Sequence, residues 1–127
     1  MKLPIVVIAY NRPDSLNRLL KSLSRANYYN CNVDLILSID KSNNNKVKIV
    51  AEEFKWDHGD KIIIRHQKNL GLREHVLKCG DLSSEYDAII MLEDDLVVSK
   101  EFYKYSLQSV QYYEDDHQIA GISLYNY

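Results

Sequence analysis

Short runs of apolar, mostly β-branched residues alternate along the chain with stretches in which apolar residues recur every three or four positions. A continuous apolar run is typical of a strand buried on both faces, and the wider spacing is typical of an amphipathic helix. The runs predict five strands, at residues 4–9, 35–39, 62–64, 88–92 and 119–124.

Four helices are predicted between these strands. The first opens at Pro13, because proline suits the first turn of a helix, and its apolar stripe consists of Leu16, Leu19, Leu20 and Leu23. The remaining helices are predicted over 47–54, over 72–82 and after a cap at Ser99.

Strand and helix alternate four times before a last strand. This order predicts an α/β fold with a mostly parallel sheet of about five strands and helices on both faces, in three layers. The length of 127 residues fits a single domain, 1–127. In such folds ligands bind beyond the carboxyl ends of the strands, so functional residues are expected directly after each strand.

Composition and charge narrow the function classes. Apolar residues make up 46% and charged residues 27% of the chain, which excludes disordered and fibrous classes. The net charge is −2 and the 16 basic residues form no run, so nucleic acid is not an expected partner. No apolar stretch is long enough for a transmembrane segment. Cys31 and Cys79 are expected to be unpaired and buried or half-buried, which suits a cytoplasmic protein, free or peripheral to the inner face of a membrane.

Polar and charged residues follow each of the first four predicted strands. Because the carboxyl ends of parallel strands meet at one edge, these residues are expected to converge there. Together they offer an arginine, a lone aspartate, a glycine-containing loop and three consecutive carboxylates, which suits a polyanion held through a divalent cation. They are Tyr10, Asn11 and Arg12, then Asp40, Lys41 and Ser42, then His66, Lys68, Asn69 and Gly71, then Glu93, Asp94 and Asp95.

The acidic triplet 93–95 has two interpretations. In an extended segment alternate side chains point the same way, so Glu93 and Asp95 would face one cleft, where their oxygens suit Mg²⁺ or Mn²⁺. The alternative is a solvated acidic turn, and the same three letters recur at 114–116, where an exposed turn is the better explanation. The position directly after a buried strand favours a metal or nucleotide role for the first copy.

Other residues at this edge also keep two interpretations. Arg12 is either a surface charge at a helix start or a phosphate ligand. Asp40 either caps the turn that follows it or accepts a hydrogen bond from a base or sugar. Gly71 suits a turn. His66 and His75 lack the paired spacing of a zinc site, which favours structural or surface roles for both.

Four segments, in order, carry a family resemblance. The chain resembles the GT-A glycosyltransferases, notably glycosyltransferase family 2, over nearly its whole length. The stretch 93–98, with Phe102 after it, is also similar to the Golgi N-acetylglucosaminyltransferase that begins hybrid N-glycans. The four segments are the opening strand 4–13, the second strand ending in Asp40, the loop Asn69-Leu70-Gly71, and the strand 86–95 that resembles the one delivering the DxD metal motif.

The resemblance implies a Rossmann-like GT-A domain that binds a nucleotide-diphosphate sugar, UDP-linked, with Mn²⁺ or Mg²⁺ as cofactor. It implies a hexosyltransferase that passes the sugar, with inversion, to a hydroxyl of a glycan, lipid or protein acceptor. The implied metal ligands are Asp95 and Glu93. The implied nucleotide-binding residues are Ala9, Tyr10, Asn11, Arg12, Asp40, Glu93 and Asp94, with Asp40 on the uracil base.

The sequence departs from this family pattern in two places. Glu93 stands where the strict motif has aspartate, and no carboxylate matches the general base of the family's acceptor-binding half. The chain is therefore expected to be a donor-binding fragment of a longer enzyme, or a module that binds the nucleotide sugar without turnover. A structural α/β domain is a further alternative. A receiver domain is excluded because no phosphoacceptor aspartate follows the third strand, and a dinucleotide-binding domain because no GxGxxG follows the first.

Overall fold

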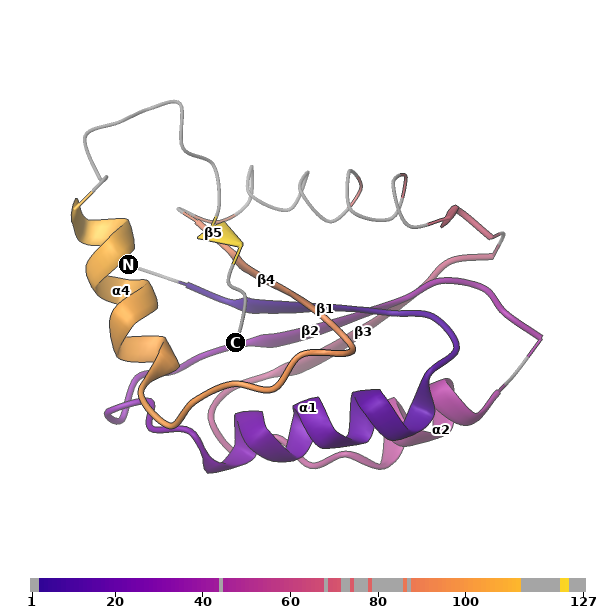
Figure 1. The fold of residues 1–127 in the computed structure, drawn as a ribbon, viewed down its shortest axis with the longest axis horizontal. Helices are drawn as coiled ribbons and strands as arrows, with labels where there is room; N and C mark the ends of the chain where they lie inside the picture. The colour runs from indigo at the N-terminus through magenta and orange to yellow at the C-terminus, as the bar shows by residue number, and fades with distance from the viewer. Residues whose placement is uncertain are drawn as a thin grey trace.

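The computed structural model describes residues 3–43, 45–67, 69–71, 74, 78, 86, 88–112 and 122–123. Five strands form one sheet in the order β3-β2-β1-β4-β5, and every pairing is parallel (Figure 1). The elements are β1 (Ile5–Ala9), α1 (Pro13–Arg25), β2 (Leu35–Ile39), α2 (Lys46–Glu53), β3 (Lys61–Arg65), β4 (Ile90–Glu93), α4 (Phe102–Tyr112) and β5 (Ile122–Ser123). The predicted α/β fold with a parallel sheet is confirmed.

The strand order places a switch point at the centre of the sheet. From β1 the chain adds β2 and β3 on one side, and then returns to place β4 on the other side of β1. The register aligns the strand ends, because Ala9 pairs with Ile39 and Ile8 pairs with Glu93. The residues that follow β1, β2 and β4 therefore emerge side by side at one edge, where such sheets bind ligands.

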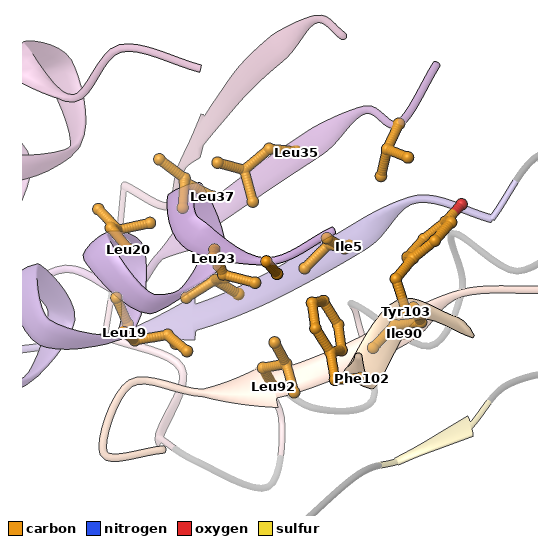
Figure 2. Close-up of a cluster of buried hydrophobic side chains, with 14 of the residues drawn as sticks. Ile5, Leu19, Leu20, Leu23, Leu35, Leu37, Ile90, Leu92, Phe102 and Tyr103 are labelled. Carbon is orange, nitrogen blue, oxygen red and sulfur yellow. The ribbon is translucent and has the colours of Figure 1, made fainter. Parts of the chain in front are cut away.

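The main core lies between the sheet and three helices. Figure 1 shows α1 and α2 side by side along one face of the sheet, and Figure 2 shows the leucines of α1 directed toward the strands. All four residues of the predicted α1 stripe are fully buried, and Phe102 and Tyr103 of α4 join the same cluster. Burying a leucine side chain contributes about 1.5–3 kcal/mol, so this stripe fixes α1 on the sheet.

The opposite face carries a smaller buried cluster. Alternation along β1 directs Val6 and Ile8 to this face, where they meet Ile36 and Ile89. The helix predicted over 72–82, which would cover this face, lies mostly outside the described residues. Lys68, His75, Cys79 and the acidic triplet 114–116 also lie outside them.

Three local predictions need correction. The strand predicted at 88–92 begins two residues later and runs to Glu93, because residues 88 and 89 precede the pairing with β1. Ser99 is not the cap of α4, since the helix begins three residues beyond it and the Ser99 carbonyl instead accepts the backbone N–H of Phe102 at 3.2 Å. Cys31 is exposed rather than buried, although it is unpaired as expected. Within the described part of the chain, no helix has the length and apolar character needed to cross a membrane.

Lys61 at the start of β3 holds the end of α2. Its ammonium group donates hydrogen bonds to the carbonyl oxygens of Ala51, Glu52 and Phe54 at 2.8, 3.0 and 2.7 Å. The last turn of α2 itself contains no basic residue. The Lys61→Met variant keeps the aliphatic stem but removes these charged bonds, so we expect its free energy of unfolding to fall by about 1.5–3 kcal/mol. Urea titration measures the change, and Lys55→Met, an exposed lysine beyond the same helix, is the control. Equal stability of the two variants would contradict this role.

Two buried tyrosines make the fold sensitive to alkaline pH. The hydroxyl groups of Tyr28 and Tyr103 donate to the carbonyl oxygens of Leu23 and Leu3 at 2.7 and 3.0 Å. Burial raises the pKa of both phenols, and that of Tyr103 to about 12. The unfolded chain ionises its tyrosines near pH 10, so the stability these groups contribute is present below about pH 10 and is lost as the pH rises toward 12.

We expect the Tyr103→Phe variant to lose less stability than the wild type between about pH 8 and about pH 11, because phenylalanine cannot ionise. Denaturant titrations of both proteins at the two pH values measure this difference. Equal losses would show that Tyr103 ionises as readily in the folded chain as in the unfolded one.

Candidate functional site

A cavity of about 340 Å³ opens at the carboxyl edge of the sheet, and we call it the strand-end cavity. This volume lies within the range of small-molecule sites. The structure places all eight residues predicted from the sequence around it, together with Ile8, Asn69 and Gly71. The lining is Ile8, Ala9, Tyr10, Asn11, Arg12, Asp40, Asn69, Gly71, Glu93, Asp94 and Asp95.

The end of β1 supplies the first wall. Ala9 is buried as the last residue of the strand, and the next three residues are exposed as the chain turns into α1. Arg12 occupies the position before the helix, where its carbonyl accepts the backbone N–H of Leu16 at 3.0 Å and its side chain forms no cap. Its guanidinium group is therefore available to the cavity.

The acidic triplet supplies the opposite wall, but not as an extended segment. Only Glu93 belongs to β4, and the chain then turns, with the backbone N–H of Leu96 donating to the Glu93 carbonyl at 3.2 Å. Glu93 and Asp95 do line one cavity, but a turn rather than strand alternation places them there. All three acidic residues line the cavity because the turn brings Asp94 in as well.

The three carboxyl groups differ in environment. Asp94 is only 9% exposed and accepts a hydrogen bond from the backbone N–H of Tyr10, whereas Asp95 is exposed. Burial raises the pKa of the Asp94 carboxyl group, against the opposing effects of the Arg12 charge and the Tyr10 hydrogen bond. Asp94 thus connects the turn after β4 to the end of β1, and Asp95 lies at the solvent-exposed opening of the cavity.

Arg12 and Asp95 face each other across this mouth. The guanidinium and carboxylate groups are 3.7 Å apart, and both side chains are about half exposed. Such a pair contributes only about 0–1 kcal/mol to stability, so a ligand can replace either partner at little cost. The pair places one cationic and one anionic group where a phosphate and a cation would meet.

Asp40 is the buried centre of the site. It is 4% exposed, and its two oxygens accept the backbone N–H groups of Lys41, Leu70 and Gly71 at 2.9, 2.8 and 3.0 Å. The structure therefore gives Asp40 the capping role and extends it to the segment 69–71, which we call loop 69–71. A carboxylate has about four acceptor positions, so one remains for a ligand.

Asn69 was expected at this edge but was not among the implied nucleotide-binding residues, and the structure makes it a functional candidate. Its amide nitrogen donates to the Tyr10 hydroxyl at 2.9 Å and to the Lys41 carbonyl at 3.2 Å, and its amide oxygen accepts the Gly71 N–H at 2.9 Å. Gly71 has a φ of +74°, a conformation that favours glycine. The Asn-x-Gly pattern in the loop after β3 was the signal available in the sequence. Through its bonds to Tyr10 and Lys41, Asn69 joins the ends of β1 and β2.

The carboxylate oxygens at the opening of the strand-end cavity suit a cation that the protein shares with a bound phosphate group. Mg²⁺ and Mn²⁺ commonly take one or two carboxylates and complete their coordination with water and ligand phosphates. Among the described residues, no group of three or more histidine, cysteine or acidic side chains is arranged to hold a metal alone. The exposed Asp95 carboxylate, with Glu93 beside it in the cavity lining, therefore fits a cation that a bound diphosphate helps to hold. His66 has a structural contact, since its Nε2 lies 3.0 Å from the Ser38 hydroxyl.

Comparison with solved structures identifies the fold. Staphylococcus aureus TarS 1–349 is 16% identical with a TM-score of 0.66, and the match covers 90% of this chain and 33% of that one. The same TarS segment in complex with UDP is 16% identical with a TM-score of 0.67, and the match covers 90% of this chain and 33% of that one. Its complex with UDP-GlcNAc is 16% identical with a TM-score of 0.66, and the match covers 90% of this chain and 32% of that one. This chain thus spans about a third of the length of those TarS chains, and at this identity the likeness establishes the GT-A fold.

Sequence comparison identifies the family. Curated protein sequences gave no significant match. The profile described as Glycosyl transferase family 2 matches residues 5–127, which includes the ends of β1, β2 and β4 and loop 69–71. The chain therefore belongs to glycosyl transferase family 2.

Proposed function

We propose that this chain is the donor-binding domain of a glycosyltransferase that uses a UDP-linked sugar and a divalent cation. The observation that carries the proposal is the strand-end cavity. It brings together the exposed carboxylate of Asp95 after β4, Arg12 after β1 and the buried Asp40 after β2. The TarS complexes with UDP and UDP-GlcNAc support it, because they share the fold. We place the domain in the cytoplasm, a reducing compartment that suits the exposed thiol of Cys31.

Each wall of the cavity has a role in holding the donor. The ring of Tyr10 is 39% exposed and offers an aromatic face on which a base can stack. The remaining acceptor position of Asp40 suits an N–H donor on the base. The guanidinium group of Arg12 suits the diphosphate, since arginine matches phosphate geometry with paired donors.

The acidic wall would hold Mn²⁺ or Mg²⁺ through Asp95, with Glu93 as the second carboxylate. When bound, the cation supplies Lewis-acid stabilisation of the charge that develops on the departing diphosphate. Arg12 leaves its pairing with Asp95 to face the phosphates, which adds a second positive charge at the same place. Asp94 keeps the turn in position through the Tyr10 N–H.

Nucleotide binding tests this proposal directly. Calorimetric titration with UDP in the presence of Mn²⁺ is expected to give saturable binding that disappears when a chelator replaces the metal. GDP and CMP, titrated under the same conditions, test whether the base matters. Absence of metal-dependent binding to all three nucleotides would overturn the proposal and leave a structural α/β domain as the better interpretation.

The second candidate function is a module that binds the nucleotide sugar without turnover. Its supporting observation is that Asp40 already holds loop 69–71 and Asp94 already holds Tyr10. The other two carboxyl groups of the lining, Glu93 and Asp95, are the proposed metal ligands. Attack by an acceptor hydroxyl needs a general base, which contributes about 10²–10⁴-fold to the rate.

We therefore expect the 127-residue chain to transfer sugar very slowly or not at all while still binding the donor. Release of UDP from UDP-sugars, measured with Mn²⁺ and a panel of acceptors, gives the rate, and the Asp95→Ala variant gives the background. Efficient transfer would show that a general base lies within this chain and would contradict the non-catalytic interpretation.

A further inference from the structure

A second cavity, of about 470 Å³, lies next to the first and shares only Asp40 with it. We call it the β2–β3 cavity, because three segments form it: the end of β2 with the loop after it, the start of α2, and the end of β3 with the residues that follow. The proposed donor site uses none of its other residues. The lining is Ile39, Asp40, Lys41, Ser42, Asn45, Lys48, Arg65, His66 and Gln67.

The charged groups of this cavity are mainly cationic. Lys41, Lys48 and Arg65 carry positive charge. Arg65 is paired with Glu52 of α2, which is not part of the lining. Within the described part of the chain, neither Lys41 nor Lys48 forms an ion pair.

The only acidic residue in the lining does not neutralise these lysines. Asp40 is 4% exposed, and both of its oxygens already accept backbone N–H groups from its own turn and from loop 69–71. No carboxylate among the described residues therefore pairs with Lys41 or Lys48. This is the reverse of the strand-end cavity, where four acidic side chains outnumber one arginine.

Neutral groups complete an environment suited to an anion. Ser42, Asn45 and Gln67 bring side-chain hydrogen-bond donors to the same wall. Asn45 directly precedes α2, so the positive end of the helix dipole lies at the cavity and adds to the attraction. A phosphate group fits this combination of two ammonium groups, an arginine and neutral donors, and it needs no divalent cation there.

We propose that the β2–β3 cavity binds a phosphate-bearing group directly, as a site separate from the metal-dependent one. The phosphate belongs either to a second substrate or to a further nucleotide, and both present the same chemistry to the lysines. Binding here does not depend on the proposed function, because the strand-end cavity would require a cation and this cavity would not.

Titration with pyrophosphate in the presence of a chelator tests the proposal, with amide NMR shifts as the readout. We expect saturable shifts at Lys41, Lys48 and His66, and none at Arg12 or Asp95. The double variant Lys41→Ala/Lys48→Ala is expected to bind at least about tenfold more weakly. The matched control is Lys21→Ala/Lys104→Ala, which removes the same charge from exposed positions on α1 and α4.

A second experiment distinguishes binding at the β2–β3 cavity from binding at the strand-end cavity. We repeat the titration without the chelator, at saturating UDP and with Mg²⁺ in excess over the pyrophosphate, and expect the pyrophosphate affinity to stay unchanged. UMP in place of pyrophosphate tests a nucleotide source against a simple phosphate. Competition by UDP, equal weakening in the control variant, or no binding at all would each overturn the proposal. Failure of UDP to bind with Mn²⁺ would count only against the donor site, since the pyrophosphate arm contains no metal.

Discussion

Replacement of Asp95 by alanine is expected to abolish manganese-dependent UDP binding while leaving the fold intact. Asp95 lies at the wet mouth of the strand-end cavity, and its only ion pair in the described structure is the exposed contact with Arg12 at 3.7 Å. Loss of such a pair costs at most about 1 kcal/mol of stability. Loss of a metal-binding carboxylate is larger, since even groups that only orient a ligand change metal affinity by about 10–100-fold.

Titration calorimetry with UDP and Mn²⁺, together with thermal unfolding of the same samples, measures both parts of this expectation. The Asp95→Asn variant keeps the shape of the side chain and removes its charge, so it should behave like Asp95→Ala. Asp57→Ala removes an acidic residue that is exposed and outside the cavity, and it should bind like the wild type. Unchanged binding in Asp95→Ala would remove the metal assignment.

Asp40→Asn is expected to release loop 69–71 and to weaken donor binding. The wild-type carboxylate accepts the backbone N–H of Leu70 on one oxygen, at 2.8 Å, and that of Gly71 on the other, at 3.0 Å. Asparagine keeps only one acceptor oxygen, so one of these two N–H groups loses its partner. A donor left without its charged acceptor costs about 1–3 kcal/mol, so we expect the free energy of unfolding to fall by about 1–3 kcal/mol. Loop 69–71 also carries Asn69, so the Tyr10 hydroxyl loses its partner and UDP affinity falls with it.

Hydrogen exchange in the absence of ligand measures the effect on loop 69–71 separately from the effect on donor binding. The amides of Leu70 and Gly71 should exchange faster in Asp40→Asn than in the wild type. Asp34→Asn is the matched control, because its carboxylate accepts a single backbone N–H, from Asp60 at 3.1 Å, before the start of β2 at the opposite edge. Equal protection of the two loop amides in wild type and Asp40→Asn would show that the carboxylate does not hold the loop.

Local chemistry was sufficient to predict most elements of the described fold. The leucine stripe of α1 and the run of β2 are periodic patterns within a few residues, and the backbone geometry of a helix or strand translates such patterns directly into burial. The order of those elements then predicted a parallel sheet and the edge where its strands end. The family resemblance added the identity of the site at that edge.

Predictions that depended on a single residue were less secure. Ser99 has the chemistry of a cap, but α4 begins at Phe102 because Phe102 and Tyr103 pack into the core from that position. Cys31 is of a type usually buried, yet it lies in an exposed loop. In both cases the packing of neighbouring elements decided the outcome, and no pattern within a few residues records it.

The sequence by itself therefore determined the strands, the first helix and the set of polar residues at one edge, because each depends on periodicity or on position after a strand. Only the tertiary structure decided how those residues meet. The bond from Asn69 to Tyr10 spans 59 positions, and the bonds from loop 69–71 to Asp40 span about 30. The basic residues of the β2–β3 cavity form no run in the sequence and gather only because β2, α2 and β3 fold side by side. Contacts between distant segments follow from the packing of whole elements, which local sequence patterns do not contain.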